Sequence, residues 1–263
     1  MISAKSILTF LKINVILLII ATVQYYSFNS AYLPLIHILI NYFLVFLIYY
    51  PNKNKKSINK NQINISTAKD HYYLISTSSL DLILIKMVQC YINFKKSNIL
   101  LDLLYFIPVS FIFEIIFDFF HYWIHRYGHT NKYLYIYFHK SHHLNIISNV
   151  WTTFHQNPID YICNNGIPMI LTTLIVNYFI GLSFYQFSMI LIYKIFIEIS
   201  GHCGKIIKAT SFTQNIWIAK LLNIELRTEC HDLHHTSNNC NYSKRFSLWD
   251  KVFNTYLNKS IKT

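Results

Sequence analysis

Two long apolar runs near the start of the chain constrain its fold more than any other feature. Residues 7–28 and 31–50 are mainly apolar, and only Asn29 and Ser30 separate them. A helix of about 20 apolar residues spans the hydrocarbon core of a bilayer. The two runs therefore predict a pair of transmembrane helices joined by a short turn.

Further apolar runs continue this pattern, and the whole chain is only 13% charged. They are residues 72–94, 99–120 and 166–200. The last run is long enough for two helices that break near Gly181, whereas residues 72–94 either cross the bilayer or lie at its interface. We expect an all-α integral membrane protein with about four to six transmembrane helices. The chain after Lys205 is mixed in character, and we expect it to be peripheral.

The charge pattern argues against nucleic acid as a partner. The formal net charge is +12, but the basic residues are scattered in loops between the apolar runs. Nucleic-acid binding needs a continuous basic stripe. In membrane proteins, basic loops beside spanning helices typically lie on the cytosolic side, near anionic lipid. The Lys-rich segment 51–71 therefore predicts a cytosolic loop. A glycan on Asn64, which begins an Asn-Ile-Ser sequon, would instead place this loop in the lumen.

Histidines gather in three short motifs, HRYGH, HKSHH and HDLHH. Their members are His125, His129, His139, His142, His143, His231, His234 and His235. On a helix, positions i, i+3 and i+4 share one face, with Cβ atoms about 5–6 Å apart. A single histidine is more often a packed core residue than a ligand, but three such motifs together predict metal binding. Eight imidazoles are enough to surround two metal ions.

The ligand type narrows the choice of metal. Zinc sites use four ligands or three, often with cysteine, so eight histidines exceed what one zinc ion requires. The five cysteines show no CxxC spacing, and we expect free thiols rather than a zinc ribbon or a disulfide framework. Imidazole also suits iron, and two iron ions fit best. A zinc hydrolase, a metal transporter and a non-catalytic membrane scaffold remain alternatives, although transporters place ligands midway along spanning helices rather than near helix ends.

The motifs resemble those of the fatty acid hydroxylase / sterol desaturase superfamily of membrane-bound di-iron oxygenases. The resemblance covers roughly residues 100–257 and includes DFFHYWIHRYGH at 118–129, FHKSHH at 138–143, ECHDLHH at 229–235 and NYSKRFSLWDKVFNT at 241–255. Two positions depart from the family pattern. Asn254 stands where glycine is usual, and FHQNPID is only a loose version of the family's His-Pro-x-Glu segment, so His155 is at most a neighbour of the ligands.

The resemblance implies a domain division and a ninth ligand. Residues 1–98 would be anchor helices with a Lys/Asn-rich loop, 99–257 the catalytic domain with a helical cap on the cytosolic side, and 258–263 a short tail. The lone His202 in EISGHCGK would join the other ligands. The implied location is the endoplasmic reticulum.

Ligating imidazoles usually donate their second N–H group to a carboxylate or carbonyl oxygen, which fixes the ring. Candidates for this outer role, chosen because they lie near the motifs, are His121, Asp118, Glu198 and Asp232. The alternative for each carboxylate is a loop cap or an ion pair with arginine. His37 and His71 lie far from the motifs and receive no role. The four tryptophans are expected to be interfacial anchors.

The resemblance also implies a reaction. Electrons from a cytochrome b5 or a reductase would reduce two iron ions, and dioxygen would be the co-substrate. The product would be a lipid hydroxylated or desaturated at an unactivated C–H bond. The sequence does not choose among sterol, fatty acyl and sphingolipid substrates, although NCNY at 239–242 is faintly similar to sterol hydroxylases.

Overall fold

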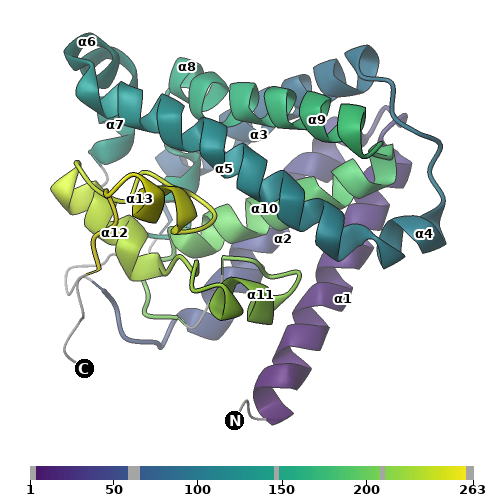
Figure 1. Cartoon of the computed structure of the whole chain (residues 1–263), viewed down its shortest axis with the longest axis horizontal. Coiled ribbons are helices and arrows are strands. Elements are labelled where there is room, and N and C mark those ends of the chain that lie inside the picture. The colour runs from purple at the N-terminus through teal and green to yellow at the C-terminus, as the bar shows by residue number, and fades with distance from the viewer. Residues whose placement is uncertain (1–3, 59–65, 145–147, 208–210, 259–263) are drawn as a thin grey trace.

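The computed structural model describes residues 4–58, 66–144, 148–207 and 211–258, and these form helices and connecting loops without a β-strand (Figure 1). Asn64, whose glycosylation would decide the side of its loop, lies outside the described residues. Five of the described helices are long and apolar enough to cross a membrane. The prediction of an all-α protein with about four to six such helices is confirmed.

The first three candidate spans follow the apolar runs of the sequence. Helix α1 covers Ala4–Ser27, α2 covers Leu33–Asn52 and α3 covers Ala68–Tyr91. Thr67 and Asp70 form a capping box, because each side chain accepts a hydrogen bond from the other residue's backbone N–H group. This cap explains why the helix begins several residues before the apolar run that predicts it.

The run at 99–120 is displaced in the structure. A short helix α4 covers Ile99–Leu104, and α5 then covers Phe106–Thr130. The apolar run ends at residue 120, whereas the helix continues through the first histidine motif to Thr130. The polar residues do not end it, because His121 and His125 lie on its buried face.

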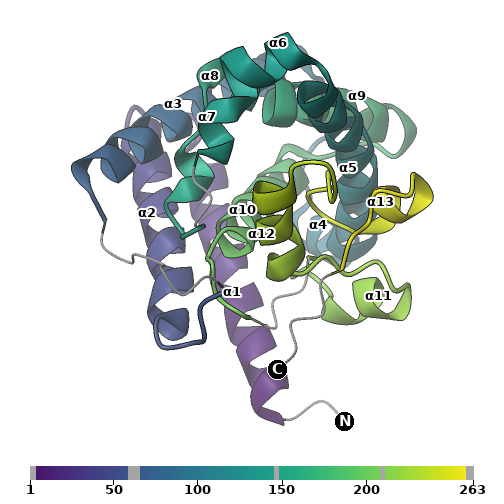
Figure 2. The same ribbon diagram turned by 90° about the vertical axis from the view of Figure 1, so that its left-hand side faces the viewer.

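The run at 166–200 does form two helices. Helix α9, Ile167–Phe179, and helix α10, Phe184–Gly201, are separated at Gly181, whose φ of +77° favours glycine. Nearly the whole length of α10 is buried, and α1 packs against it. Figure 2 shows α10 at the centre of the molecule, between α1 and α12.

The remaining elements are short. In chain order they are α6 (Lys132–Leu134), η1 (Tyr135–His139), α7 (Lys140–His143), η2 (Thr152–Phe154), α8 (Pro158–Tyr161), η3 (Ile162–Gly166), α11 (Ile216–Leu221), α12 (Thr228–Ser237) and α13 (Leu248–Val252). Of these, α8 and η3 run directly into α9, and together they form the candidate span Pro158–Phe179. The chain after Lys205, which we expect to be peripheral to the bilayer, contains no candidate span among its described residues. It nevertheless packs into the protein. Phe246 and Arg245 are fully buried, and α13 packs against α5.

Candidate metal centre

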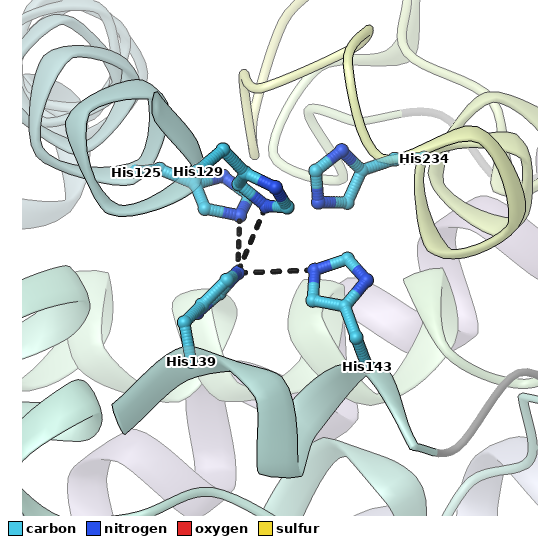
Figure 3. A group of neighbouring side chains, drawn as sticks. All are labelled: His125, His129, His139, His143 and His234. Carbon is cyan, nitrogen blue, oxygen red and sulfur yellow. Dashed lines mark hydrogen bonds between the residues drawn. The ribbon is translucent and has the colours of Figure 1, made fainter. Parts of the chain in front are cut away.

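Five histidines from three parts of the chain converge on one point (Figure 3). Helix α5 supplies His125 and His129, the η1–α7 segment supplies His139 and His143, and α12 supplies His234. The Nε2 atom of His139 lies 3.1 Å from that of His125, and 3.0 Å from those of His129 and His143. We call these residues the five-histidine group.

A second set of four imidazoles lies beside the first. His142 comes from α7, His202 follows the end of α10, and His231 and His235 lie one turn apart on α12. The Nε2 atom of His231 lies 2.9 Å from that of His202 and 3.2 Å from that of His235. We call these residues the four-histidine group.

The hydrogen bonds of the outer ring nitrogens fix which nitrogen carries the proton. The Nδ1 atoms of His125, His202 and His234 donate to the carbonyl oxygens of Tyr242, Glu198 and Cys240, at 2.8, 2.9 and 2.7 Å respectively. A carbonyl oxygen can only accept, so each of these Nε2 atoms keeps an unprotonated lone pair.

Lone pairs of this kind face one another in the five-histidine group, and in the four-histidine group the lone pair of His202 Nε2 faces His231 Nε2 at 2.9 Å. His139 also uses Nδ1 for a carboxylate, that of Asp160 at 2.9 Å, so its Nε2 and that of His125 meet as two acceptors 3.1 Å apart. The buried Nε2 of His234 has no hydrogen-bond partner. Facing acceptors repel each other, and a cation between them would turn this repulsion into attraction. The arrangement therefore fits a metal ion in each group.

Burial keeps the imidazoles neutral, as metal binding requires. Removal from water lowers the pKa of His143 to about 3 and that of His202 to about 4. The pKa values of His231, His234 and His235 also lie well below the ordinary value for the same reason. At neutral pH, a metal ion thus competes with few protons for these nitrogens.

The donor set also bears on which metal fits. Both groups consist of imidazoles alone, and neither contains a thiolate. The nearby Cys203 is a protonated thiol, because burial raises its pKa to about 11. A donor set of imidazole nitrogen suits iron as well as zinc, and the two adjacent groups provide for two ions.

All nine histidines predicted as ligands lie in one of these two groups, while their role as ligands stays a prediction. The residues predicted around them lie differently. His121 is in neither group, but its Nδ1 donates to the carbonyl oxygen of Asn164 at 2.7 Å, and its ring lies 5.0 Å from that of His125. It is thus a hydrogen-bonded neighbour of the five-histidine group.

The three predicted carboxylates take other partners than the imidazoles. Asp118 accepts the backbone N–H groups of residues 244–246, at 2.7, 2.9 and 3.0 Å, and so caps that loop. The Glu198 carboxylate forms ion pairs, and only its carbonyl oxygen holds His202. Burial raises the pKa of Asp232, and the hydroxyl of Ser148 is its hydrogen-bond partner.

The other histidines lie outside both groups. His155 forms an ion pair with Asp70 at 2.7 Å. His37 contacts Gln24 and Asp81 between the spanning helices, and His71 hydrogen-bonds Tyr42 at 3.1 Å. Trp249 donates its indole N–H group to the carbonyl oxygen of Ile115 on α5 at 3.0 Å.

Two residues of the site escaped the sequence reasoning. Asp160 is the one carboxylate that holds an imidazole of either group among the described residues, and it stands in NPID, the segment that only loosely matches the family. The sequence did contain a signal for it, because this position has aspartate where the family's His-Pro-x-Glu segment has glutamate. Lys244 had no such signal, because its neighbours are far away in sequence: Asn165, which accepts from its Nζ at 2.7 Å, and Glu198 at 3.4 Å.

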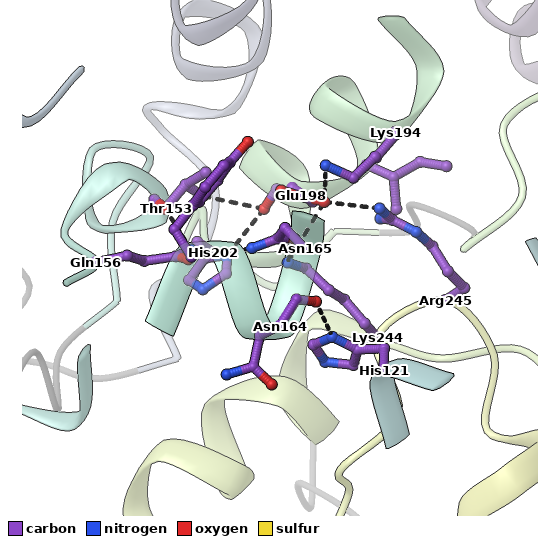
Figure 4. A network of polar contacts seen from close by, with 12 residues as sticks. His121, Thr153, Gln156, Asn164, Asn165, Lys194, Glu198, His202, Lys244 and Arg245 are labelled. Carbon is purple, nitrogen blue, oxygen red and sulfur yellow. Dashed lines mark hydrogen bonds and ion pairs between the residues drawn. The ribbon is translucent and has the colours of Figure 1, made fainter. Parts of the chain in front are cut away.

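A small cavity, which we call the histidine cavity, lies between the two groups and has a volume of about 20 Å³. Histidines of both groups line it, namely His125, His139, His142, His202 and His231. Lys244, Asn164 and Asn165, which Figure 4 labels, also line it. A cavity of this size holds a water-sized molecule but no lipid chain.

Comparison with known proteins adds independent findings. A profile described as "Fatty acid hydroxylase" matches residues 110–255. The chain is 28% identical over 151 residues to fatty acid hydroxylase vlmA of Lecanicillium sp, a match that covers 55% of this chain and 40% of that protein. It is 26% identical over 154 residues to sphinganine C4-monooxygenase 1 of Arabidopsis thaliana, covering 56% of this chain and 54% of the relative.

A very-long-chain aldehyde decarbonylase of Oryza sativa subsp. indica is 31% identical over 150 residues, covering 56% of this chain and 23% of the relative. The matches thus cover about half of these relatives' length or less. No solved structure matches this chain significantly.

Proposed function

Because the chain belongs to the fatty acid hydroxylase family, we propose that it is a membrane-bound di-iron oxygenase that hydroxylates or desaturates an unactivated C–H bond of a lipid. Nine buried or half-buried imidazoles in two groups, with ring nitrogens about 3 Å apart in each, are the observation that carries this proposal. Such an arrangement needs cations, and two adjacent redox metal ions suit reactions with dioxygen.

The five-histidine group would hold one iron ion and the four-histidine group the other. When bound, the two ions would supply the redox chemistry that activates dioxygen. The chain's own residues keep the rings in place: Asp160 holds His139, and backbone carbonyl oxygens hold His125, His202 and His234. Such outer hydrogen bonds fix the ring orientation and the protonated nitrogen.

The histidine cavity would admit dioxygen and exclude bulk water. Its volume of about 20 Å³ matches a small molecule, and five histidines of the two groups border it. The reacting carbon of the lipid would have to enter from its edge. Exclusion of water strengthens the electrostatic interactions inside such a site and limits side reactions.

We place the protein in the membrane of the endoplasmic reticulum, with the histidine groups on the cytosolic side and a cytochrome b5 or a reductase as electron donor. The five candidate spans support the membrane location, and the basic loop at 51–71 supports the orientation. Two relatives are named for a fatty acid and for sphinganine, which favours an acyl or sphingoid chain over a sterol as substrate.

Isotope labelling tests the proposed reaction. Iron-loaded protein in lipid nanodiscs, supplied with a reductase, ¹⁸O₂ and either a sphingoid, a fatty acyl or a sterol substrate, should yield a product with one labelled oxygen or with two hydrogens fewer. His142→Ala is the matched control and should give no product. Failure of the iron-loaded protein to convert any of the three classes, or metal-dependent hydrolysis without oxygen uptake, would refute the proposal.

A further inference from the structure

Lys244 occupies an unusual position for a lysine. Its side chain is only 10% exposed, and it lines the histidine cavity together with imidazoles of both groups. Figure 4 shows the side chain extending past Asn165 toward Glu198. A buried ammonium group beside two metal groups is repelled by the ions unless negative charge separates them.

Lys244 shares its ion-pair partner with two other cations. Glu198 lies 3.4 Å from Lys244, 3.2 Å from Lys194 and 2.7 Å from Arg245, and Arg245 also pairs with Glu114. The ion pair of Lys244 is thus the longest of the three. An anion on the cavity side would give this ammonium group a partner of its own.

Hydrogen-bonding capacity leads to the same conclusion. An ammonium group has three donors, and Lys244 directs them to Asn165 Oδ1 at 2.7 Å and Glu198 Oε1 at 3.4 Å, which leaves one for the cavity. The one carboxylate that lines the cavity, Asp160, already accepts from His139 and from Asn164 at 2.9 and 2.7 Å. The third N–H donor of Lys244 therefore indicates that a small anion binds in the histidine cavity, whose volume is about 20 Å³.

We propose that Lys244 is a catalytic residue whose ammonium group binds the negative charge that develops on oxygen in the histidine cavity. This inference rests on the proposed function, because electrons from the donor protein must reduce dioxygen there. Lys244 loses no proton in this role and forms no covalent bond; it donates a charge-assisted hydrogen bond. A donor aimed at developing charge in a site without bulk water is an effective form of catalysis.

Lys194 provides a matched control for this role. It is also buried and also pairs with Glu198, at 3.2 Å, but it lines a different cavity, beside Asp81 and Met169. Lys244→Met and Lys194→Met each remove one positive charge and one ion pair with Glu198. Only Lys244→Met removes a donor from the histidine cavity.

Azide serves as the probe, because it is a small anion that binds open metal positions. Wild type and both variants are loaded with ferrous iron and oxidised, their metal content is measured, and azide is titrated by its absorption band. With metal content unchanged, Lys244→Met should bind azide at least about 10-fold more weakly than wild type, and Lys194→Met within about 3-fold of it. Should Lys244→Met fail to fold, Lys244→Gln, whose amide can still bind Asn165, carries the same prediction.

The outcomes separate the two proposals. Equal azide affinity in iron-loaded wild type and Lys244→Met, or an equal loss in both lysine variants, would overturn the role of Lys244 and leave the proposed function intact. A folded wild-type protein that takes up no iron would instead overturn the proposed function and this inference with it.

Discussion

The five-histidine group and the four-histidine group differ in how their rings are held and in what they face. In the five-histidine group, His139 contacts three other imidazoles and is held by a carboxylate. In the four-histidine group, His202 is held by a carbonyl oxygen, and three of the four rings line the histidine cavity.

This difference would give two bound metal ions different roles. The group with more imidazoles and an anionic support would leave less room for a further ligand and would hold its ion more firmly. The group with fewer imidazoles has an open side toward Lys244 and the histidine cavity. We therefore expect small molecules to bind mainly at the four-histidine group.

Removal of a single histidine ligand, from either group, should have the largest effect. His139→Ala and His202→Ala should each abolish turnover, and each should lower the metal content from two ions per chain to one, because the other group keeps its rings. Elemental analysis of the folded variants measures this. Loss of both ions in both variants would show that the groups are one cooperative site, and unchanged metal content would exclude these residues as ligands.

Acid should destabilise the metal-free protein through both groups. The folded-state pKa is about 3 for His143 and about 4 for His202, below the ordinary value near 6.5. Between these pH values, the unfolded chain therefore binds more protons than the folded protein does. The stability that these neutral imidazoles contribute is fully present above about pH 6.5 and is lost as the pH falls toward about 4. For His202 alone the loss is on the order of 3 kcal/mol.

Thermal unfolding of chelator-treated protein in detergent measures this loss. The midpoint should fall steadily between about pH 7 and about pH 5, and His202→Gln should reduce the dependence. A midpoint that does not change over this range would contradict the neutral, buried state of the imidazoles.

Asp160→Asn should have a smaller effect that is confined to one group. The amide still accepts from His139 but carries no charge, so the metal affinity of the five-histidine group should fall by about 10- to 100-fold. Asp232→Asn is the matched control, because that carboxylate pairs with Ser148 instead of an imidazole. A competitive chelator titration measures both; equal affinities in the two variants would refute the special role of Asp160.

The sequence predicts those features that depend on neighbouring residues. Apolar runs locate α1 and α2 because a bilayer span is a local property of composition. The spacing of the histidine motifs likewise identifies the nine imidazoles that converge. Helix α5 shows the limit, because burial of His121 and His125 extends it beyond its apolar run.

Features that depend on packing between distant segments could not be predicted. The division of nine histidines into five and four follows from the meeting of α5, α7, α10 and α12. Asp118 caps a loop 126 residues away, and Arg245 is fully buried between Glu114 and Glu198. No local pattern distinguishes these side chains from solvent-exposed charges.

The most direct test of this account is the metal content of the wild-type protein. Folded, purified protein is reconstituted with ferrous iron without oxygen, freed of loose metal, and analysed for elements against its protein concentration. The account predicts two iron ions per chain. A correctly folded preparation that holds no metal after reconstitution would contradict it.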